Sequence, residues 1–472
     1  MKAARRAHGR KTAAALALVG LIAVGGRESA ATSNTTVMNV SGFGEPLQEI
    51  RDELPGTTAR FAQFAGGQHE FTDVEDIPRL GPLFNSRSCG SCHFQPALGG
   101  SGAFISEVRI RRNPSGGPLH IFATDNMLRA GPQTQGLLTF FDNGLASMPV
   151  GCQLTAPRCG KSACQRQEAA TTTFTKKLVV CDPTSRDFNA GLNCVAQRQS
   201  QALFGLGFVE AVDDATFDAL AASQPISIRG TVRRVDELGR TRVARFGWKD
   251  DMATLRGFAG VAYINEMGIT NPDNPTELSQ CALNVVKYGV VLDHDDDPED
   301  EIDNDGRSDT DRFVDFMRAL DAPPTLQEDA DAQAGHALFD GIGCGGCHVD
   351  ALTTAAAPSQ FVPPTTGSVP IDPVLLDTYL GNKTFHPFSD FLLHDMGSLG
   401  DGITSGAAGP RLMRTAPLWG VRAKSFLLHD GRARTIEEAV AFHDGQAAAA
   451  RDLFAALGGT ERLQVTTYLN AH

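Results

Sequence analysis

Two short motifs constrain this chain more than any other feature. The first is Cys89-Gly90-Ser91-Cys92-His93, and the second is Cys344-Gly345-Gly346-Cys347-His348. The two thiols of a C-x-x-C-H motif can form thioethers with the vinyl groups of a porphyrin, and the adjacent imidazole can bind its iron. A zinc site or a thiol redox pair can share the two cysteines, but such sites seldom carry His directly after the second Cys in both copies. The motifs therefore predict two covalently bound c-type haems, with His93 and His348 as iron ligands.

The first 31 residues have the pattern of a secretory signal peptide. Basic residues between Lys2 and Lys11 precede an apolar run over residues 12–24, and the small residues Ser29-Ala30-Ala31 follow it. The apolar run is short for a membrane span, so a permanent anchor is the weaker interpretation. We therefore predict a periplasmic protein with no stable membrane span after the leader is removed. Bacterial c-type haems are attached in the same compartment.

Cysteine content and charge bound the remaining possibilities. The cysteines outside the two motifs are even in number, and in an oxidising compartment they can pair as disulfides whose connectivity the sequence leaves open. The formal net charge of −13 argues against a nucleic acid partner and permits docking to a basic redox protein. The cysteines concerned are Cys152, Cys159, Cys164, Cys181, Cys194 and Cys281.

Three pairs of similar segments, in the same order, form an internal repeat. In each half a Phe stands five residues before the first motif cysteine, and these residues are Phe84 and Phe339. Further along, the segment Arg198–Gly205 resembles the segment Arg414–Gly420. The segment containing Trp248 then aligns with the segment containing His429. The repeat predicts a mainly α fold with two tandem cytochrome c-like haem domains.

Helix-breaking residues mark the boundary between these two domains. Pro323-Pro324 must end one helix, and a new helix is predicted from Leu326. The predicted domains are residues 40–322 and residues 326–472. The first is longer because it carries loop insertions and a small β-hairpin, predicted from the alternating run Ile226–Val232 and the following Thr241–Phe246.

A strongly acidic insert between Asp293 and Asp311 has some features of a calcium-binding loop. Set against the EF-hand template, the acidic residues and a glycine fall on the expected early positions, but Arg312 occupies position 12, where a bidentate Glu belongs. Calcium binding and a solvated acidic loop both stay open, and the solvated loop is favoured. The matching residues are Glu301, Asp303, Asp305, Gly306 and Asp309.

Several further segments carry a family resemblance over about residues 80–445. With them the chain resembles the di-haem oxidoreductase family of peroxidase type, also labelled thiol oxidoreductases. More distantly, it is similar to bacterial dihaem cytochrome c peroxidases and to the dihaem enzyme that matures methylamine dehydrogenase. The resemblance implies an oxidoreductase in which an electron-transfer haem feeds a reactive haem. The segments are Leu80–Asn85, Gln95–Gly100, Gly205–Ala211, Phe246–Lys249, Leu393–Gly397 and Phe426–Arg432.

For the second haem, the resemblance implies a distal iron ligand on the helix after the F-x-x-H-D-G segment. That position is His443. An imidazole at a helix end can coordinate iron, and paired imidazoles give a low-spin electron carrier. Met396 is the rival ligand. The alternatives are a surface histidine and a core methionine.

For the first haem, the resemblance implies a Trp between the two haems and a Glu beside the peroxide-binding face. Trp248 matches the first, and Glu266 matches the second although its motif lacks the family's Pro. A core aromatic and a helix-terminal glutamate are the alternatives. His120 is the only His between His93 and Arg198, and its neighbours resemble a strand. We therefore expect an open or water-bound first haem, with His120 as the less favoured ligand.

The favoured interpretation is an exported dihaem oxidoreductase of peroxidase type. It would take electrons from a small redox protein or another donor and react with hydrogen peroxide or a small oxidisable substrate. One alternative is an electron-transfer cytochrome in which both irons are six-coordinate. The other is a dihaem enzyme that oxidises an organic or protein substrate.

Overall fold

The computed structural model describes residues 35–36, 42–53, 58–75, 86–102, 107–111, 179–180, 194–267, 269–275, 302–363 and 372–472. The chain divides into two compact units, Met1–Ser33 and Asn34–His472, and every described residue belongs to the second. The predicted leader, Phe84, His120 and Glu301 lie outside the described residues. So do the side chains of the six cysteines predicted to pair with one another, so their disulfides stay a prediction.

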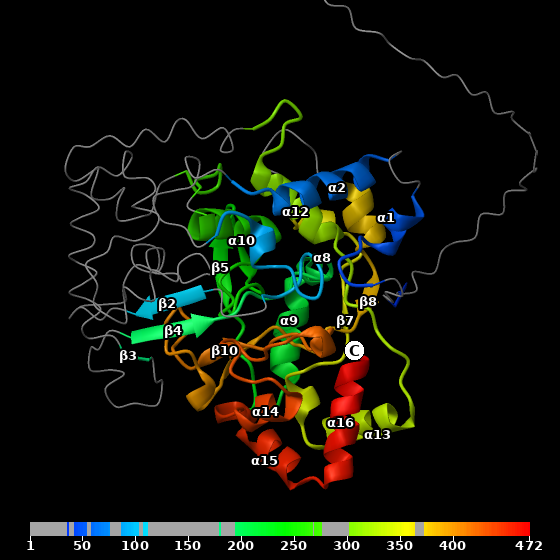
Figure 1. Cartoon of the computed structure of the whole chain (residues 1–472), viewed down its shortest axis with the longest axis vertical. Helices are drawn as coiled ribbons and strands as arrows, with labels where there is room; N and C mark the ends of the chain where they lie inside the picture. The colour runs from blue at the N-terminus through cyan, green and yellow to red at the C-terminus, as the bar shows by residue number, and fades with distance from the viewer. Residues whose placement is uncertain are drawn as a thin grey trace, which may run out of the picture. The chain divides into compact units, whose positions relative to one another are not determined.

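Helices make up most of the described regular structure, as the sequence predicts for a mainly α protein (Figure 1). Short 3-10 and π turns join many of them. The α-helices are α1 (Gln48–Asp52), α2 (Ala59–Thr72), α8 (Leu206–Glu210), α9 (Asp214–Ser223), α10 (Leu255–Ala262), α12 (Asp309–Ala319), α13 (Ala330–Gly341), α14 (Ile436–Ala441), α15 (Ala448–Ala456) and α16 (Gly459–Ala471). The turns are η1 (Cys89–Ser91), η4 (Tyr263–Met267), η6 (Cys344–Gly346), η7 (Pro358–Gln360), η8 (Val374–Tyr379), η9 (Gly397–Leu399), η10 (Val421–Ala423) and η11 (Gly445–Ala447).

The described strands are short and form small separate sheets. One sheet has the order β1-β8-β7 and another the order β2-β4-β3, while β9 pairs with β10 and β5 with β6. The β5–β6 hairpin begins later than predicted, because Ile226–Val232 forms no strand and Thr231 makes only an isolated bridge to Leu393. The strands are β1 (Thr35–Thr36), β2 (Glu107–Arg111), β3 (Val179–Val180), β4 (Cys194–Arg198), β5 (Arg234–Glu237), β6 (Arg240–Val243), β7 (Leu352–Thr353), β8 (Lys383–Phe385), β9 (Leu393–Asp395) and β10 (Leu412–Arg414).

The helix before each C-x-x-C-H motif crosses a second helix at a glycine. Helix α2 packs against α12 at Gly67, where a Cβ would meet the carbonyl oxygen of Arg312. Helix α13 packs against α16 at Gly335, where a Cβ would meet the carbonyl oxygen of Gln464. Glycine permits this approach because it carries no side chain. The same crossing therefore occurs in both halves of the sequence.

A buried phenylalanine follows each crossing glycine by one helical turn. Phe71 follows Gly67, and Phe339 follows Gly335; each is 3% exposed. The ring centroid of Phe71 lies 6.0 Å from that of His93, and the ring centroid of Phe339 lies 6.4 Å from that of His348. Phe71 is thus the structural counterpart of Phe339. Counting back from the motif cysteines pairs Phe339 with Phe84 instead, and Phe84 lies outside the described residues. Helix α2 ends at Thr72, well before Cys89, whereas α13 ends at Gly341, just before Cys344.

The repeat around Trp248 and His429 is confirmed in the backbone. Phe246 and Met252 form a β-bridge, and so do the equivalent Leu427 and Ala433. Both copies carry positive φ at the same two positions, 84° and 51° at Gly247 and Asp250, and 70° and 69° at Leu428 and Gly431. A Thr side chain then caps the next helix in each copy, Thr254 for α10 and Thr435 for α14.

The predicted helix boundary before the paired prolines also holds. Helix α12 ends at Ala319, ahead of Pro323-Pro324, and α13 begins at Ala330. At the start of α12, Ser308 and Asp311 form a reciprocal capping box. The division into domains at residues 322 and 326 stays a prediction. Among the described residues, no helix combines the length and the apolar character needed to cross a membrane.

Candidate haem sites

Each C-x-x-C-H motif folds as one tight turn. In the first, the backbone N–H of His93 donates to the carbonyl oxygen of Cys89 at 3.2 Å, and in the second His348 donates to Cys344 at 3.0 Å. All four motif cysteines are free thiols in this structure. Burial raises the pKa of Cys92 to about 11 and that of Cys344 to about 12. The thiols of Cys92 and Cys344 are therefore kept neutral near neutral pH, unlike reactive thiolates.

The three candidate imidazole ligands share one hydrogen-bond pattern. The Nδ1 atom of His93 lies 3.1 Å from the carbonyl oxygen of Gly100, that of His348 lies 2.9 Å from Phe388, and that of His443 lies 2.8 Å from Ala439. A carbonyl can only accept, so Nδ1 must carry the proton and the lone pair stays on Nε2. This is the arrangement by which metal-binding histidines are usually held.

Burial also keeps these imidazoles in the neutral form that metal binding requires. It lowers the pKa of His348 to about 4, and it lowers the pKa of His93 and of His443. A protonated imidazole has no lone pair for a metal, so the depressed pKa values preserve ligand character in mildly acidic solution.

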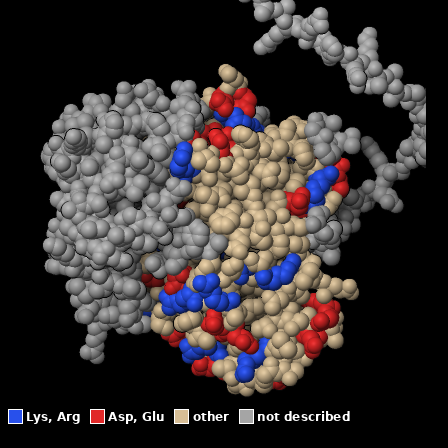
Figure 2. Space-filling view, viewed as in Figure 1, with Lys and Arg blue, Asp and Glu red and all other residues tan. Residues whose placement is uncertain are grey.

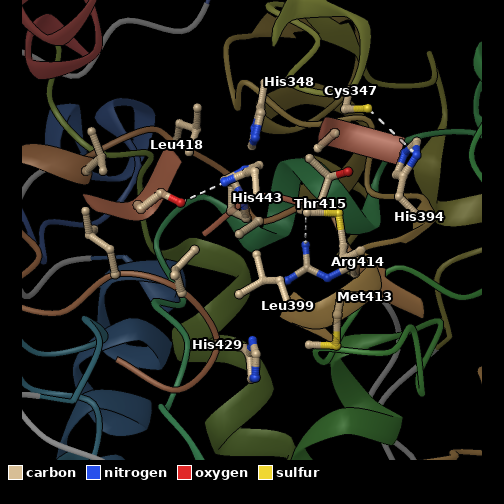
Figure 3. A pocket seen from close by; sticks show the side chains of 18 of the residues that line it. Cys347, His348, His394, Leu399, Met413, Arg414, Thr415, Leu418, His429 and His443 are labelled. Carbon is tan, nitrogen blue, oxygen red and sulfur yellow. Dashed lines mark hydrogen bonds between the residues drawn. The ribbon is translucent and has the colours of Figure 1, made fainter. Parts of the chain in front are cut away.

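His348 and His443 face each other across one cavity. Their ring centroids are 6.5 Å apart, and Figure 3 shows the two rings pointing towards one another. With metal–imidazole bonds of about 2 Å on each side, two ligands of a single metal would be separated by a similar distance. The geometry therefore fits His348 and His443 as two ligands of one metal ion.

The cavity between these rings has a volume of about 340 Å³ and mostly apolar walls. Cys344 and Cys347 line it, as do Met396 and Trp248. An apolar cavity with convergent metal ligands and two thiols fits a porphyrin attached at the second motif. Met396, the rival ligand, lies in the wall of this cavity, but the ring that faces His348 is His443.

Glu266 lies near the first motif, on the π-helical turn η4 that follows α10. Its carboxylate charge adds to the raised pKa of Cys92 and opposes the lowered pKa of His93, although burial is the larger cause of both shifts. The carbonyl oxygen of Glu266 also accepts from the backbone N–H of Ser86 at 3.2 Å, just before the motif. The structure therefore brings Glu266 and the first motif together, as the sequence predicts.

Trp248 connects the surroundings of the two motifs. Its indole N–H donates to the carbonyl oxygen of Gln199 at 2.9 Å, and the next residue, Ser200, donates from its hydroxyl to the carbonyl oxygen of Cys92 at 2.6 Å. Trp248 also lines the cavity that contains His348. Its ring meets His429 edge to face, with centroids 6.2 Å apart. Trp248 thus lies between the first motif and the cavity at the second motif, which we call the second cavity.

Two buried histidines in the cavity wall were not assigned a role from the sequence. His394 places Nδ1 3.7 Å from Sγ of Cys347 and Nε2 2.9 Å from a carboxylate oxygen of Asp390 (Figure 3). Burial alone would lower the pKa of His394, but the hydrogen bonds to Asp390 and Cys347 raise it to about 10. His429 is 5% exposed, and burial lowers its pKa to about 4. Both lie in segments that carry the family resemblance, which is the signal that could have singled them out.

In the described part of the acidic insert, Arg312 forms ion pairs with the carboxylates that the EF-hand template would assign to calcium. Its Nη2 atom lies 2.6 Å from Asp303 and 3.2 Å from Asp305. A guanidinium at this position supplies the positive charge that a cation would otherwise supply. The arrangement favours the solvated acidic loop.

The family comparison agrees with the haem interpretation. The family profile described as "Di-haem oxidoreductase, putative peroxidase" matches residues 181–472, which is more than half of the chain. Among solved structures, hydrazine synthase of Kuenenia stuttgartiensis is similar with 14% identity and a TM-score of 0.33, covering 95% of this chain and 100% of that chain. A MauG-like protein associated with microbial copper homeostasis has 13% identity and a TM-score of 0.26, covering 57% and 88%. No curated protein matches significantly. On the family match, the chain belongs to the di-haem oxidoreductase family.

Proposed function

We propose that this protein is an exported c-type dihaem peroxidase: His348 and His443 would hold an electron-transfer haem, and His93 would hold the haem at which the oxidant reacts. The single observation that carries the proposal is the contrast between the two sites. The second has an imidazole facing His348 at 6.5 Å. The first has a non-coordinating residue at the equivalent place.

The register of the repeat identifies that residue. His443 stands eight residues after the helix-capping Thr435, and the residue eight positions after the equivalent cap Thr254 is Ala262. Because the two copies share their bridge, their positive φ angles and their caps, Ala262 is the counterpart of His443. A methyl group cannot bind iron. The equivalence supports a first site whose sixth position is open to an oxidant.

A carboxylate stands where that oxidant would react. When bound, haem iron supplies one-electron redox chemistry. Reduction of hydrogen peroxide to two waters consumes two electrons and two protons, and one proton must move between the two oxygens as their bond breaks. Glu266 would accept a proton from the nearer oxygen and return it to the departing one, acting as general base and then general acid.

Electron delivery is supported by the position of Trp248. Hydrogen bonds join its indole to Gln199, and the adjacent Ser200 to Cys92, while its ring forms part of the second cavity. Trp248 would thus couple the two redox centres. The donor to the second site would be a small redox protein outside the cell's inner membrane, in keeping with the leader pattern.

The test is spectroscopy of the resting protein after expression with haem-maturation machinery. We expect two covalently bound haems, one low-spin and one high-spin ferric EPR signal, and a change in the high-spin signal alone on adding peroxide. Reduced cytochrome should then be oxidised in proportion to the peroxide consumed. Two low-spin signals without peroxide turnover would instead indicate an electron-transfer cytochrome. Turnover of an organic or protein substrate without use of the reduced cytochrome would indicate the third function class.

A further inference from the structure

The second cavity has basic groups and no acidic ones among its described lining residues. Four Lys and Arg side chains line it, namely Arg245, Arg414, Lys424 and Arg451, and no described Asp or Glu does. His394 also lines it, and its charge is balanced by Asp390 at 2.9 Å. On the surface, by contrast, Figure 2 shows acidic and basic side chains interspersed over the region of α14 and α15. A single sign of charge facing an apolar space is costly unless an anion enters that space.

Two of these four cations already have close carboxylate partners. Arg245 forms an ion pair with Asp214, and Arg451 lies 2.9 Å from a carboxylate oxygen of Asp452. Their charge is balanced outside the cavity, so neither calls for an anion within it.

Lys424 and Arg414 differ from that pair. In the described part of the chain, the Nζ atom of Lys424 donates to the carbonyl oxygen of Pro417 at 3.3 Å and forms no ion pair with a carboxylate within 4 Å. Arg414 uses Nε on the carbonyl oxygen of Gly247 and Nη1 on that of Thr415, while Asp250 lies 3.6 Å from Nε. Among the described residues, Nη2 of Arg414 has no acceptor.

The two cations are also close enough to disfavour each other. Burial, and then the charge of Arg414, lower the pKa of Lys424 to about 8. Two like charges are placed in one wall, although a neutral side chain at either position would avoid the repulsion. An anion bound between them would relieve this repulsion and would raise the pKa of Lys424.

We infer that Lys424 and Arg414 bind the propionate carboxylates of the haem attached at Cys344 and Cys347. This inference rests on the proposed function, which places a haem in that cavity. A porphyrin matches both properties of the space, because its macrocycle is apolar and its two propionates are the only anionic groups it carries. Arg414 offers a planar guanidinium suited to a carboxylate, and Lys424 offers a point charge.

The test is an EPR-monitored redox titration of the holoprotein, in which the low-spin signal reports the second haem. A positive charge beside a propionate favours the reduced haem, so Lys424→Gln and Lys424→Met should lower the potential of the low-spin centre, while Lys424→Arg should keep it near the wild-type value. The control is Lys383→Gln, which removes the same charge from a lysine paired with Glu49 at 2.6 Å. Its low-spin potential should stay unchanged.

The other outcomes are distinguishable. A low-spin haem whose potential is unchanged in both neutral variants would overturn the inference and leave the proposed function intact. A shift of the high-spin centre alone would also overturn it, because Lys424 would then serve the first haem. A free-anion site would show itself if added phosphate shifted the wild-type low-spin potential but not that of Lys424→Gln, and this too would contradict propionate binding. Absence of haem at the second motif would contradict the proposed function itself.

Discussion

His348 and His443 face each other with ring centroids 6.5 Å apart, and each donates its Nδ1 proton to a backbone carbonyl. The two residues are far apart in the sequence: His348 ends the second motif, and His443 follows α14. The pair has the separation and the tautomers that two ligands of one iron need.

Replacing His443 should change the spin state of one haem. In His443→Ala the low-spin ferric EPR signal should convert to high-spin, because one axial imidazole is lost. Met396→Ala is the matched control, since Met396 lines the same cavity, and it should keep both signals. If the low-spin signal were lost in Met396→Ala and kept in His443→Ala, the ligand would be the methionine.

A histidine introduced at the first site should fill the sixth coordination position of its iron. Ala262→His places an imidazole at the position equivalent to His443, so the high-spin signal should become low-spin and peroxide consumption should fall to the uncatalysed background. Ala262→Leu adds similar bulk without a nitrogen and should leave the iron high-spin. An Ala262→His protein that still reacts fully with peroxide would contradict the equivalence.

Neutralising Glu266 should slow the chemistry without removing the haem. We expect Glu266→Gln to lower kcat/KM for peroxide by about 10²–10⁴-fold, the usual contribution of a positioned acid–base group. Glu70 provides the control, because its charge also acts on the first motif, through Cys89. Glu70→Gln should change kcat/KM far less. Equal losses in both variants would point to a general charge effect rather than proton transfer.

The crossing of α13 and α16 should depend on Gly335. In Gly335→Ala the added Cβ meets the carbonyl oxygen of Gln464, so the helices must move apart, and the free energy of unfolding should fall by about 1–3 kcal/mol. Gly341 ends the same helix with open space around it. Gly341→Ala should be neutral or should stabilise by up to about 1 kcal/mol. Thermal unfolding followed by circular dichroism measures both changes.

His429 should make the fold sensitive to acid. Burial lowers its pKa from 6.5 to about 4, so the unfolded chain binds a proton in this range that the folded chain does not. Stability is therefore fully present above pH 6.5 and is lost as the pH falls towards 4, by on the order of 3 kcal/mol. His429→Gln removes that proton uptake. Its melting temperature should decline less than that of the wild type between pH 7 and pH 4.5, and parallel declines would show that another group is responsible.

Local sequence anticipated the parts of the site that depend on short spacing. The break before Pro323-Pro324 and the Thr435 cap each involve neighbouring residues, and the structure has both as predicted. The role of the two C-x-x-C-H motifs in haem attachment stays a prediction. The predicted start of the β-hairpin was wrong. The hairpin begins at Arg234 rather than Ile226, because alternation alone does not say which alternating run finds a partner strand.

Contacts between distant residues had to come from the tertiary structure. Spacing from Cys89 could not identify Phe71 as the counterpart of Phe339 in the repeat. The ring that lies against His93 is determined by the helix crossing at Gly67, not by the distance along the chain. Nor could composition show that Lys424 and Arg414 share a wall without a described acid. The sequence by itself predicted covalent attachment of haem at Cys89, Cys92, Cys344 and Cys347, because that prediction depends only on adjacent residues. Only the tertiary structure decided that an imidazole faces His348, because that contact is made by packing between segments far apart in the chain.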